Sequence, residues 1–227
     1  MSVAALGALP PRPAWRSPVV PWLHCSPPRR ALLRETWGLG ELSHQLTPSQ
    51  YDTYRKLLLW ESRPSREAGR YFVMDSSRRW GKSKLGLGWL TEKALRFPNL
   101  RLLYIGPVLK EIRKFVLPLM AAILSECPPE LRPRFLKTDL TYVFPNGSRL
   151  EVVAMDKNPD GARGNALDFA FLDEAAFFQN LDYLVTSVLD PQMLGRPHAR
   201  VLMAPTPPTS PGHVWSSEMV PDAKLRD

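Results

Sequence analysis

The chain has 227 residues, 44% of them hydrophobic and 23% charged, which fits one main globular domain and excludes a coiled coil, a collagen-like fibre and a wholly disordered chain. Its net charge of +8 favours a polyanionic partner, although many basic proteins have none. The two cysteines cannot form a disulfide framework, and the longest apolar run, residues 115–124, is far shorter than the roughly 20 residues of a bilayer span, so we expect a cytoplasmic protein that enters no membrane.

The N-terminal part of the chain is rich in proline. Seven of the 24 prolines lie between positions 10 and 28, and proline removes a backbone donor from helices and sheets. We therefore predict an extended, largely disordered arm over residues 1–45, which serves either as a docking arm or as a tail without a role. An ordered domain is expected over residues 46–216, followed by a truncated tail over residues 217–227.

The sequence after this arm predicts a helix, a strand and a second helix. Thr47 and Gln50 match a capping box with a proline at the first helical position, so a helix is expected to run through Trp60. Residues 71–74 form a short apolar run of β-formers, and residues 82–97 show a helical pattern after a polar turn.

The remaining apolar runs predict a sheet that is buried on both faces. Their residues are continuously apolar rather than alternating, which is typical of parallel strands covered on both sides. An Asn-Gly pair marks a hairpin turn. We therefore predict an α/β fold with a mainly parallel sheet, helices on both faces and one inserted β-hairpin. The expected elements are strands at 100–105, 166–172 and 200–204, a helix at 109–124 kinked at Pro118, and a hairpin of residues 141–144 and 149–155.

The loop after the first strand carries most of a phosphate-binding pattern. Residues 76–83 match G-x-x-x-x-G-K-[ST] at Gly81, Lys82 and Ser83, and depart from it at Ser76. In such a loop the backbone N–H groups cradle phosphate, the lysine reaches the β- and γ-phosphates, and the hydroxyl binds Mg²⁺. We expect the Lys82 ammonium to lie in solvent-accessible space. Three matched residues are a weak signal, and their position between a strand and a helix is what favours nucleotide binding.

An acidic pair supplies the second half of a nucleotide site. Asp173 and Glu174 directly follow an apolar run, 91 residues after Lys82. Asp173 would hold Mg²⁺ and Glu174 would polarise the attacking water as a general base. Either residue could instead only cap the next helix, which acidic side chains favour.

These features together resemble the ATPase domain of the large terminase subunit, the motor that packages DNA into tailed bacteriophage capsids. The resemblance spans residues 50–215 and rests on the arginine-rich loop, the strand ending in Asp-Glu, and Thr206 after the last apolar strand. It implies a P-loop NTPase of the ASCE or RecA-like type with ATP and Mg²⁺ as cofactors. It also implies double-stranded DNA as a partner and a homo-oligomeric ring on a capsid portal, with a small terminase subunit as a further partner.

The resemblance also assigns roles to individual residues, and several of them keep an alternative. Gln50 either contacts adenine or is only the capping partner, and Arg79 has either a solvated or phosphate-steering role or a catalytic one. Arg163 either acts as a finger on a neighbouring subunit's nucleotide or lies in a flexible loop. Thr206 either couples γ-phosphate sensing to DNA movement or opens a proline-rich turn. The expected catalytic residues are Glu174, Lys82, Arg78 and Arg163; the nucleotide-binding residues are Gln50, Ser77, Arg78, Arg79, Trp80, Gly81, Lys82, Ser83 and Thr206; and the metal ligands are Ser83 and Asp173.

One departure from the family keeps other functions open. Large terminases normally continue into a nuclease domain of RNase H type, for which residues 217–227 leave no room, so we expect either separate motor and nuclease chains or a fragment. The alternatives are a fragment of another ASCE-type motor, such as a superfamily 2 helicase, and a nucleotide-binding remnant without catalysis. A helicase motor needs a second RecA-like lobe, and the sequence shows one phosphate loop.

Overall fold

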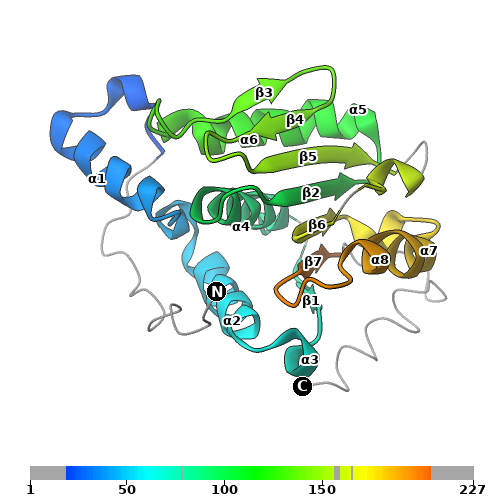
Figure 1. Ribbon diagram of the computed structural model, residues 1–227. Helices are drawn as coiled ribbons and strands as arrows, with labels where there is room; N and C mark the ends of the chain where they lie inside the picture. The colour runs from blue at the N-terminus through cyan, green and yellow to red at the C-terminus, as the bar shows by residue number, and fades with distance from the viewer. Residues whose placement is uncertain (1–18, 78, 156–158, 165, 206–227) are drawn as a thin grey trace.

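The computed structural model describes residues 19–77, 79–155, 159–164 and 166–205, which are arranged around one β-sheet (Figure 1). The strand order is β1-β7-β6-β2-β5-β4-β3, from bottom to top in Figure 1. The first five strands of this order are parallel, and β4 and β3 extend the sheet in antiparallel fashion. Strand β7 separates β1 from β6, which is consistent with the expected ASCE type. The strands are β1 (Tyr71–Val73), β2 (Arg101–Gly106), β3 (Arg134–Leu136), β4 (Thr141–Val143), β5 (Arg149–Ala154), β6 (Phe169–Asp173) and β7 (Arg200–Ala204).

The strands confirm the predicted mainly parallel sheet and differ from the prediction in two details. Strand β6 begins at Phe169 rather than Ala166, because the Leu167 N–H donates instead to the carbonyl of Gln192. Pairing of β4 with β5 confirms the hairpin, whose partner β3 was not predicted. Three residues are too few for β3 to show a strand period in the sequence.

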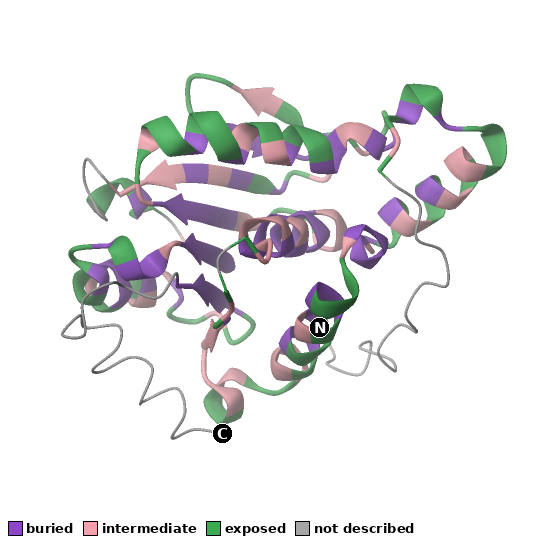
Figure 2. Ribbon diagram, turned by 180° about the vertical axis from the view of Figure 1, so that it is seen from behind, coloured by how far each residue is buried: buried purple, intermediate pink, exposed green. Residues whose placement is uncertain are grey.

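Helices cover both faces of the sheet, as the continuous apolar runs predict. The central strands are buried, as the purple ribbons of Figure 2 show. Side chains alternate along β6: Phe169 and Phe171 belong to one apolar cluster, and Ala170 and Leu172 to another. Helices α1, α2, α4 and α6 contribute to the first cluster, and α7 and η8 to the second. The helices are η2 (Trp22–His24), α1 (Pro27–Gly38), η3 (Ser43–Gln45), α2 (Pro48–Ser62), α3 (Ser65–Ala68), α4 (Lys82–Arg96), α5 (Leu109–Glu111), η4 (Ile112–Val116), α6 (Leu117–Ile123), η5 (Leu124–Glu126), η6 (Pro159–Ala162), η7 (Ala175–Phe177), α7 (Leu181–Tyr183), η8 (Leu184–Leu189) and α8 (Asp190–Gln192).

The prediction of an extended arm over residues 1–45 is wrong for its described part, residues 19–45. Helix α1 begins at Pro27, where a missing N–H costs nothing because the first helical donors have no intrahelical acceptor. Its Leu33 and Trp37 are fully buried in the same apolar cluster as α4. The ordered domain therefore begins before residue 46.

The two helices that were best defined in the sequence are confirmed. Helix α2 has the complete capping box: the Gln50 N–H donates to Thr47 Oγ1, and the Thr47 N–H donates to Gln50 Oε1. Helix α4 runs from Lys82 to Arg96. No helix within the described ranges is both long and apolar enough to cross a membrane.

The segment after β2 is helical throughout, but it is irregular where a kink was expected. It is α-helical at α5, π-helical at η4 and α-helical again at α6, whose second residue is Pro118. Proline lacks an N–H and its ring crowds the carbonyl four residues earlier, and the wider π-turn accommodates both defects. The irregularity therefore precedes Pro118 rather than lying at it.

Candidate active site

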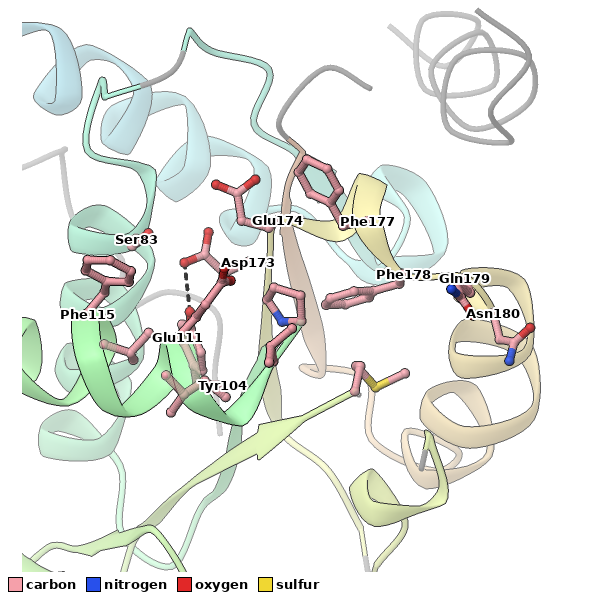
Figure 3. A pocket seen from close by; sticks show the side chains of 15 residues that line it. Ser83, Tyr104, Glu111, Phe115, Asp173, Glu174, Phe177, Phe178, Gln179 and Asn180 are labelled. Carbon is pink, nitrogen blue, oxygen red and sulfur yellow. Dashed lines mark hydrogen bonds between the residues drawn. The ribbon is translucent and has the colours of Figure 1, made fainter. Parts of the chain in front are cut away.

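The carboxyl ends of the parallel strands meet at one edge of the sheet, where a cavity of about 970 Å³ opens (Figure 3). Open α/β sheets bind ligands at this edge. The lining of the cavity includes the polar side chains of Ser83, Asp173 and Glu174 and the aromatic side chains of Tyr104 and Phe115.

The loop from β1 to α4 is shaped by Gly81 and held by Gln50. Gly81 has a left-handed φ of 96°, and a Cβ there would lie 2.2 Å from Gln50 Nε2. The Gln50 amide nitrogen donates to the carbonyls of Trp80 (3.0 Å) and Gly81 (3.2 Å), while its oxygen completes the capping box on α2. Gln50 is thus a capping partner and a brace of the phosphate loop at once.

The expectation that the Lys82 ammonium is solvent-accessible is wrong. Lys82 is 6% exposed, and its Nζ donates to the Ser76 carbonyl at 3.0 Å, across the loop. Ser76, which replaces the first glycine of the pattern, does not have a positive φ, so a serine fits there without strain. Its buried Oγ has no hydrogen-bond partner among the described residues.

Asp173 ends β6 as a buried carboxylate with one oxygen open. It is 3% exposed, and its Oδ2 accepts a 2.8 Å hydrogen bond from the Tyr104 hydroxyl. Within the part of the chain that the structure describes, Oδ1 has no partner. Burial raises the pKa of Asp173 above its usual value, against the opposing effect of the hydroxyls of Ser83 and Tyr104.

Glu174 is held in a strained backbone conformation beside Asp173. Its φ of 56° and ψ of 37° lie in the left-handed region, which costs a side-chain-bearing residue about 1–2 kcal/mol. Its Oε2 is buried and has no partner among the described residues. Two carboxylate oxygens without partners therefore lie in one cavity, which is typical of a site that receives a charged ligand.

Close packing of α4 on β6 brings Ser83 to Asp173. A Cβ at Gly86 would lie 2.3–2.5 Å from the ring atoms of Phe171, so only glycine lets the helix lie this near the strand. Ser83 precedes Gly86 by about one turn and lines the cavity with Asp173.

The donor set fits a magnesium ion that is shared with phosphates. The described residues hold no group of three His, Cys, Asp or Glu side chains able to bind a metal by themselves. Magnesium in nucleotide sites takes one or two protein oxygens and completes its shell with phosphates and water. Ser83 and the open Oδ1 of Asp173 can supply those oxygens.

The structure brings together most of the predicted site residues, but not all of them. Gln50, Trp80, Gly81 and Lys82 are linked by the hydrogen bonds and helix start described above, and Ser83, Asp173 and Glu174 share the cavity. Ser77 and Arg79 are exposed, and Arg79 has a φ of 62°. Arg78 and Thr206 lie outside the described residues.

Arg163 is not part of this cavity. It is half exposed, and its guanidinium donates to Asp160 (2.6 Å) and to the Tyr183 hydroxyl (2.8 Å). Tyr183 also donates to Asp160, so the three side chains form a closed surface triad.

The sequence analysis missed Tyr104. It lies within a continuous apolar strand, where a tyrosine is indistinguishable from a core residue. Only the pairing of β2 with β6 places it beside Asp173.

The fold and the site define an α/β protein of the P-loop nucleotide-binding class. The sequence matches the family model described as terminase large subunit, T4likevirus-type, N-terminal, over residues 73–213, which is more than half of the chain. The chain therefore belongs to the large-terminase family. No curated protein matches the sequence.

Solved large terminases share the fold at low sequence identity. The bacteriophage HK97 large terminase has a TM-score of 0.62 and 15% identity, covering 80% of this chain and 37% of its own. The large terminase of a thermophilic bacteriophage in complex with ADP has a TM-score of 0.58 and 17% identity, covering 80% of this chain and 44% of its own. A mutant ATPase domain of the Thermus phage P74-26 large terminase has a TM-score of 0.53 and 20% identity, covering 76% and 68%. The chain thus spans less than half the length of the first two proteins.

Proposed function

We propose that this chain is the ATP-hydrolysing motor domain of a large terminase. The observation that carries the proposal is that Ser83, which directly follows Lys82 at the start of α4, shares one cavity with Asp173 and Glu174, each of which has a carboxylate oxygen without a partner among the described residues. Two similar solved terminases are complexes with ADP and with ATP-gamma-S, which supports a nucleotide as the ligand.

Each residue of the site has a distinct task in this proposal. The N-terminus of α4 attracts phosphate through its unpaired N–H groups and its dipole. Lys82 exchanges the Ser76 carbonyl for phosphate oxygens, so it is held ready rather than free. Ser83 and Asp173 would hold Mg²⁺, and the ion would supply neutralisation of the charge on the transferring phosphoryl group. Glu174 orients the attacking water and accepts its proton.

The remaining predicted residues complete the motor. Gln50 braces the loop and contacts the base, Arg78 and Arg79 hold phosphate, and Thr206 couples hydrolysis to movement. Arg163 is exposed and can reach a neighbouring subunit once Asp160 releases it. We propose that the chain works in a homo-oligomeric ring on a capsid portal, moves double-stranded DNA, and cooperates with a small terminase subunit. Its net charge of +8 supports a polyanionic partner.

Hydrolysis of ATP by the purified chain tests the proposal. Glu174→Gln should bind ATP and lose turnover, and Lys82→Met, which keeps the buried stem, should lose both binding and turnover. Lys84→Ala is the matched control, because Lys84 also lies in the first turn of α4 and donates to a backbone carbonyl, that of Gln45, but is not part of the phosphate-loop pattern. Wild-type turnover in Glu174→Gln would contradict the proposal. Nucleotide binding without any wild-type turnover would favour the inactive remnant instead.

A further inference from the structure

Tyr104 reaches the edge of the sheet from inside it. Strands β2 and β6 are neighbours, and Tyr104 pairs in register with Phe171, two residues before Asp173. Because side chains alternate along a strand, Phe171 and Asp173 lie on the same face of β6, the face that α4 covers. The long tyrosine ring extends along this face to the end of the strand, where its hydroxyl contacts Asp173 (Figure 3).

The ring of Tyr104 is fixed by its surroundings. Tyr104 is 1% exposed, and its ring packs edge-on against Phe171 with centroids 5.6 Å apart. A Cβ at Gly106 would come within 3.1 Å of the ring, so glycine at the end of β2 leaves room for it. The hydroxyl therefore stands at a defined point beside the site.

The hydroxyl can only donate to Asp173. A phenol hydroxyl has one proton, and in the 2.8 Å bond to Asp173 the Tyr104 hydroxyl is the donor and the carboxylate oxygen the acceptor. That one proton is used on Oδ2, and Oδ1 is left without a partner among the described residues. A carboxylate held through one oxygen has a fixed plane, and its other oxygen is available to a cation.

We propose that Tyr104 is a positioning residue, which fixes the Asp173 carboxylate so that Oδ1 is aimed at the divalent cation of the nucleotide. The inference rests on the proposed function, because it requires Asp173 to bind the metal. Hydrogen-bond partners of metal ligands orient them, and their removal typically weakens metal binding by about 10- to 100-fold.

A second tyrosine in the core offers a matched control. The Tyr54 hydroxyl donates to the buried carboxylate of Glu92 at 2.7 Å, much as Tyr104 donates to Asp173. The other oxygen of Glu92 accepts from the Leu42 N–H at 2.6 Å, and neither residue lines the cavity. Tyr54→Phe therefore removes the same kind of bond where no metal is expected.

The test is Mn²⁺ binding in the presence of ADP, followed by electron paramagnetic resonance, in wild type, Tyr104→Phe and Tyr54→Phe. We expect Tyr104→Phe to bind Mn²⁺ about tenfold more weakly and to bind ADP in EDTA as wild type does. Tyr54→Phe should bind Mn²⁺ within twofold of wild type, whatever its melting temperature.

Several results would overturn the inference, and each is distinct. Mn²⁺ affinity of Tyr104→Phe within twofold of wild type would make the bond irrelevant to the metal. Failure of Tyr104→Phe to fold, which circular dichroism would show, would make Tyr104 a core residue only. Wild type that takes up no Mn²⁺ with ADP would overturn the proposed function itself, and the inference with it.

Discussion

Two buried aspartates lie at opposite ends of β6 and differ in how many hydrogen-bond partners the protein gives their carboxylates. Asp168, just before the strand, is 1% exposed, and Asp173, at its end, is 3% exposed. Asp168 accepts from the Arg101 N–H (2.9 Å), from His198 (2.8 Å) and from the guanidinium of Arg196. Asp173 accepts from the Tyr104 hydroxyl at 2.8 Å, and its Oδ1 has no partner among the described residues.

The pKa directions of the two carboxyls follow from this difference. Burial opposes ionisation of both. Hydrogen bonds from His198 and Arg101, with the charge of Arg196, outweigh burial at Asp168 and lower its pKa. At Asp173 burial prevails and the pKa is raised. The carboxylate at the amino edge of the sheet is satisfied by protein groups, whereas the one at the carboxyl edge, where we propose the nucleotide to bind, is not fully satisfied by the described residues.

Removing Asp168, whose carboxylate accepts hydrogen bonds from three residues, should have the largest effect on stability. Asp168→Ala removes a buried carboxylate and leaves the partly buried Arg101 N–H and the side chain of Arg196 without this acceptor, and we expect a loss of about 3 kcal/mol in the free energy of unfolding. Urea denaturation at pH 7 measures it. Asp160→Ala, which breaks an exposed ion pair, should not change stability measurably. Equal effects of the two substitutions would contradict the account of the amino edge.

Two glycines of α4 allow its packing on β6 to be tested, because Gly86 contacts the strand and Gly88 does not. Gly86→Ala places a methyl group against the ring of Phe171 and should cost about 2 kcal/mol. Gly88→Ala, in the same helix, meets nothing within 4 Å and should stabilise the chain by up to about 1 kcal/mol, because alanine favours helix. Thermal unfolding of both variants separates packing from helix propensity. Stabilisation by both would show that the close approach is not required.

Lowering the pH should reduce the contribution of Asp168 to the free energy of unfolding. Its pKa in the folded state is lowered, so its stabilising contribution is present above the usual aspartate pKa of about 4 and is lost as the pH falls through the folded value. Urea denaturation from pH 7 to pH 3 should show the difference in stability between wild type and Asp168→Asn shrinking with falling pH. A constant difference would contradict the lowered pKa.

The smallest expected effect is a gain at Glu174. Glu174→Gly relieves the left-handed backbone and should raise the free energy of unfolding by about 1 kcal/mol, while removing the proposed general base. Glu174→Ala keeps the Cβ and serves as the control, which should not show this gain. Chemical denaturation of both variants decides whether the backbone or the carboxylate is the source of strain.

The elements that could be predicted from the sequence are those defined by residues close together in the chain. The capping box of α2 and the strand-loop-helix around Lys82 are formed by neighbouring residues, and both are present. Helix α1 was missed because its prolines were treated as helix breakers, although Pro27 starts the helix.

Contacts between distant residues could not be predicted in the same way. Tyr104 meets Asp173 across 69 residues of sequence, and only the strand order places them together. The burial of Lys82 likewise depends on its bond to the Ser76 carbonyl within a particular loop conformation. Motif residues predict a nucleotide site from the sequence, whereas the contacts that hold their side chains follow from the fold.

The variant Asp173→Asn tests the central comparison most directly, with stability and ATP hydrolysis measured on the same preparation. Because burial disfavours the charged form of Asp173 and raises its pKa, we expect Asp173→Asn to have a free energy of unfolding at pH 7 equal to or above that of wild type and to lose Mg²⁺-dependent ATP hydrolysis. Marked destabilisation with hydrolysis retained would contradict this expectation, because Asp173 would then serve the fold as Asp168 does.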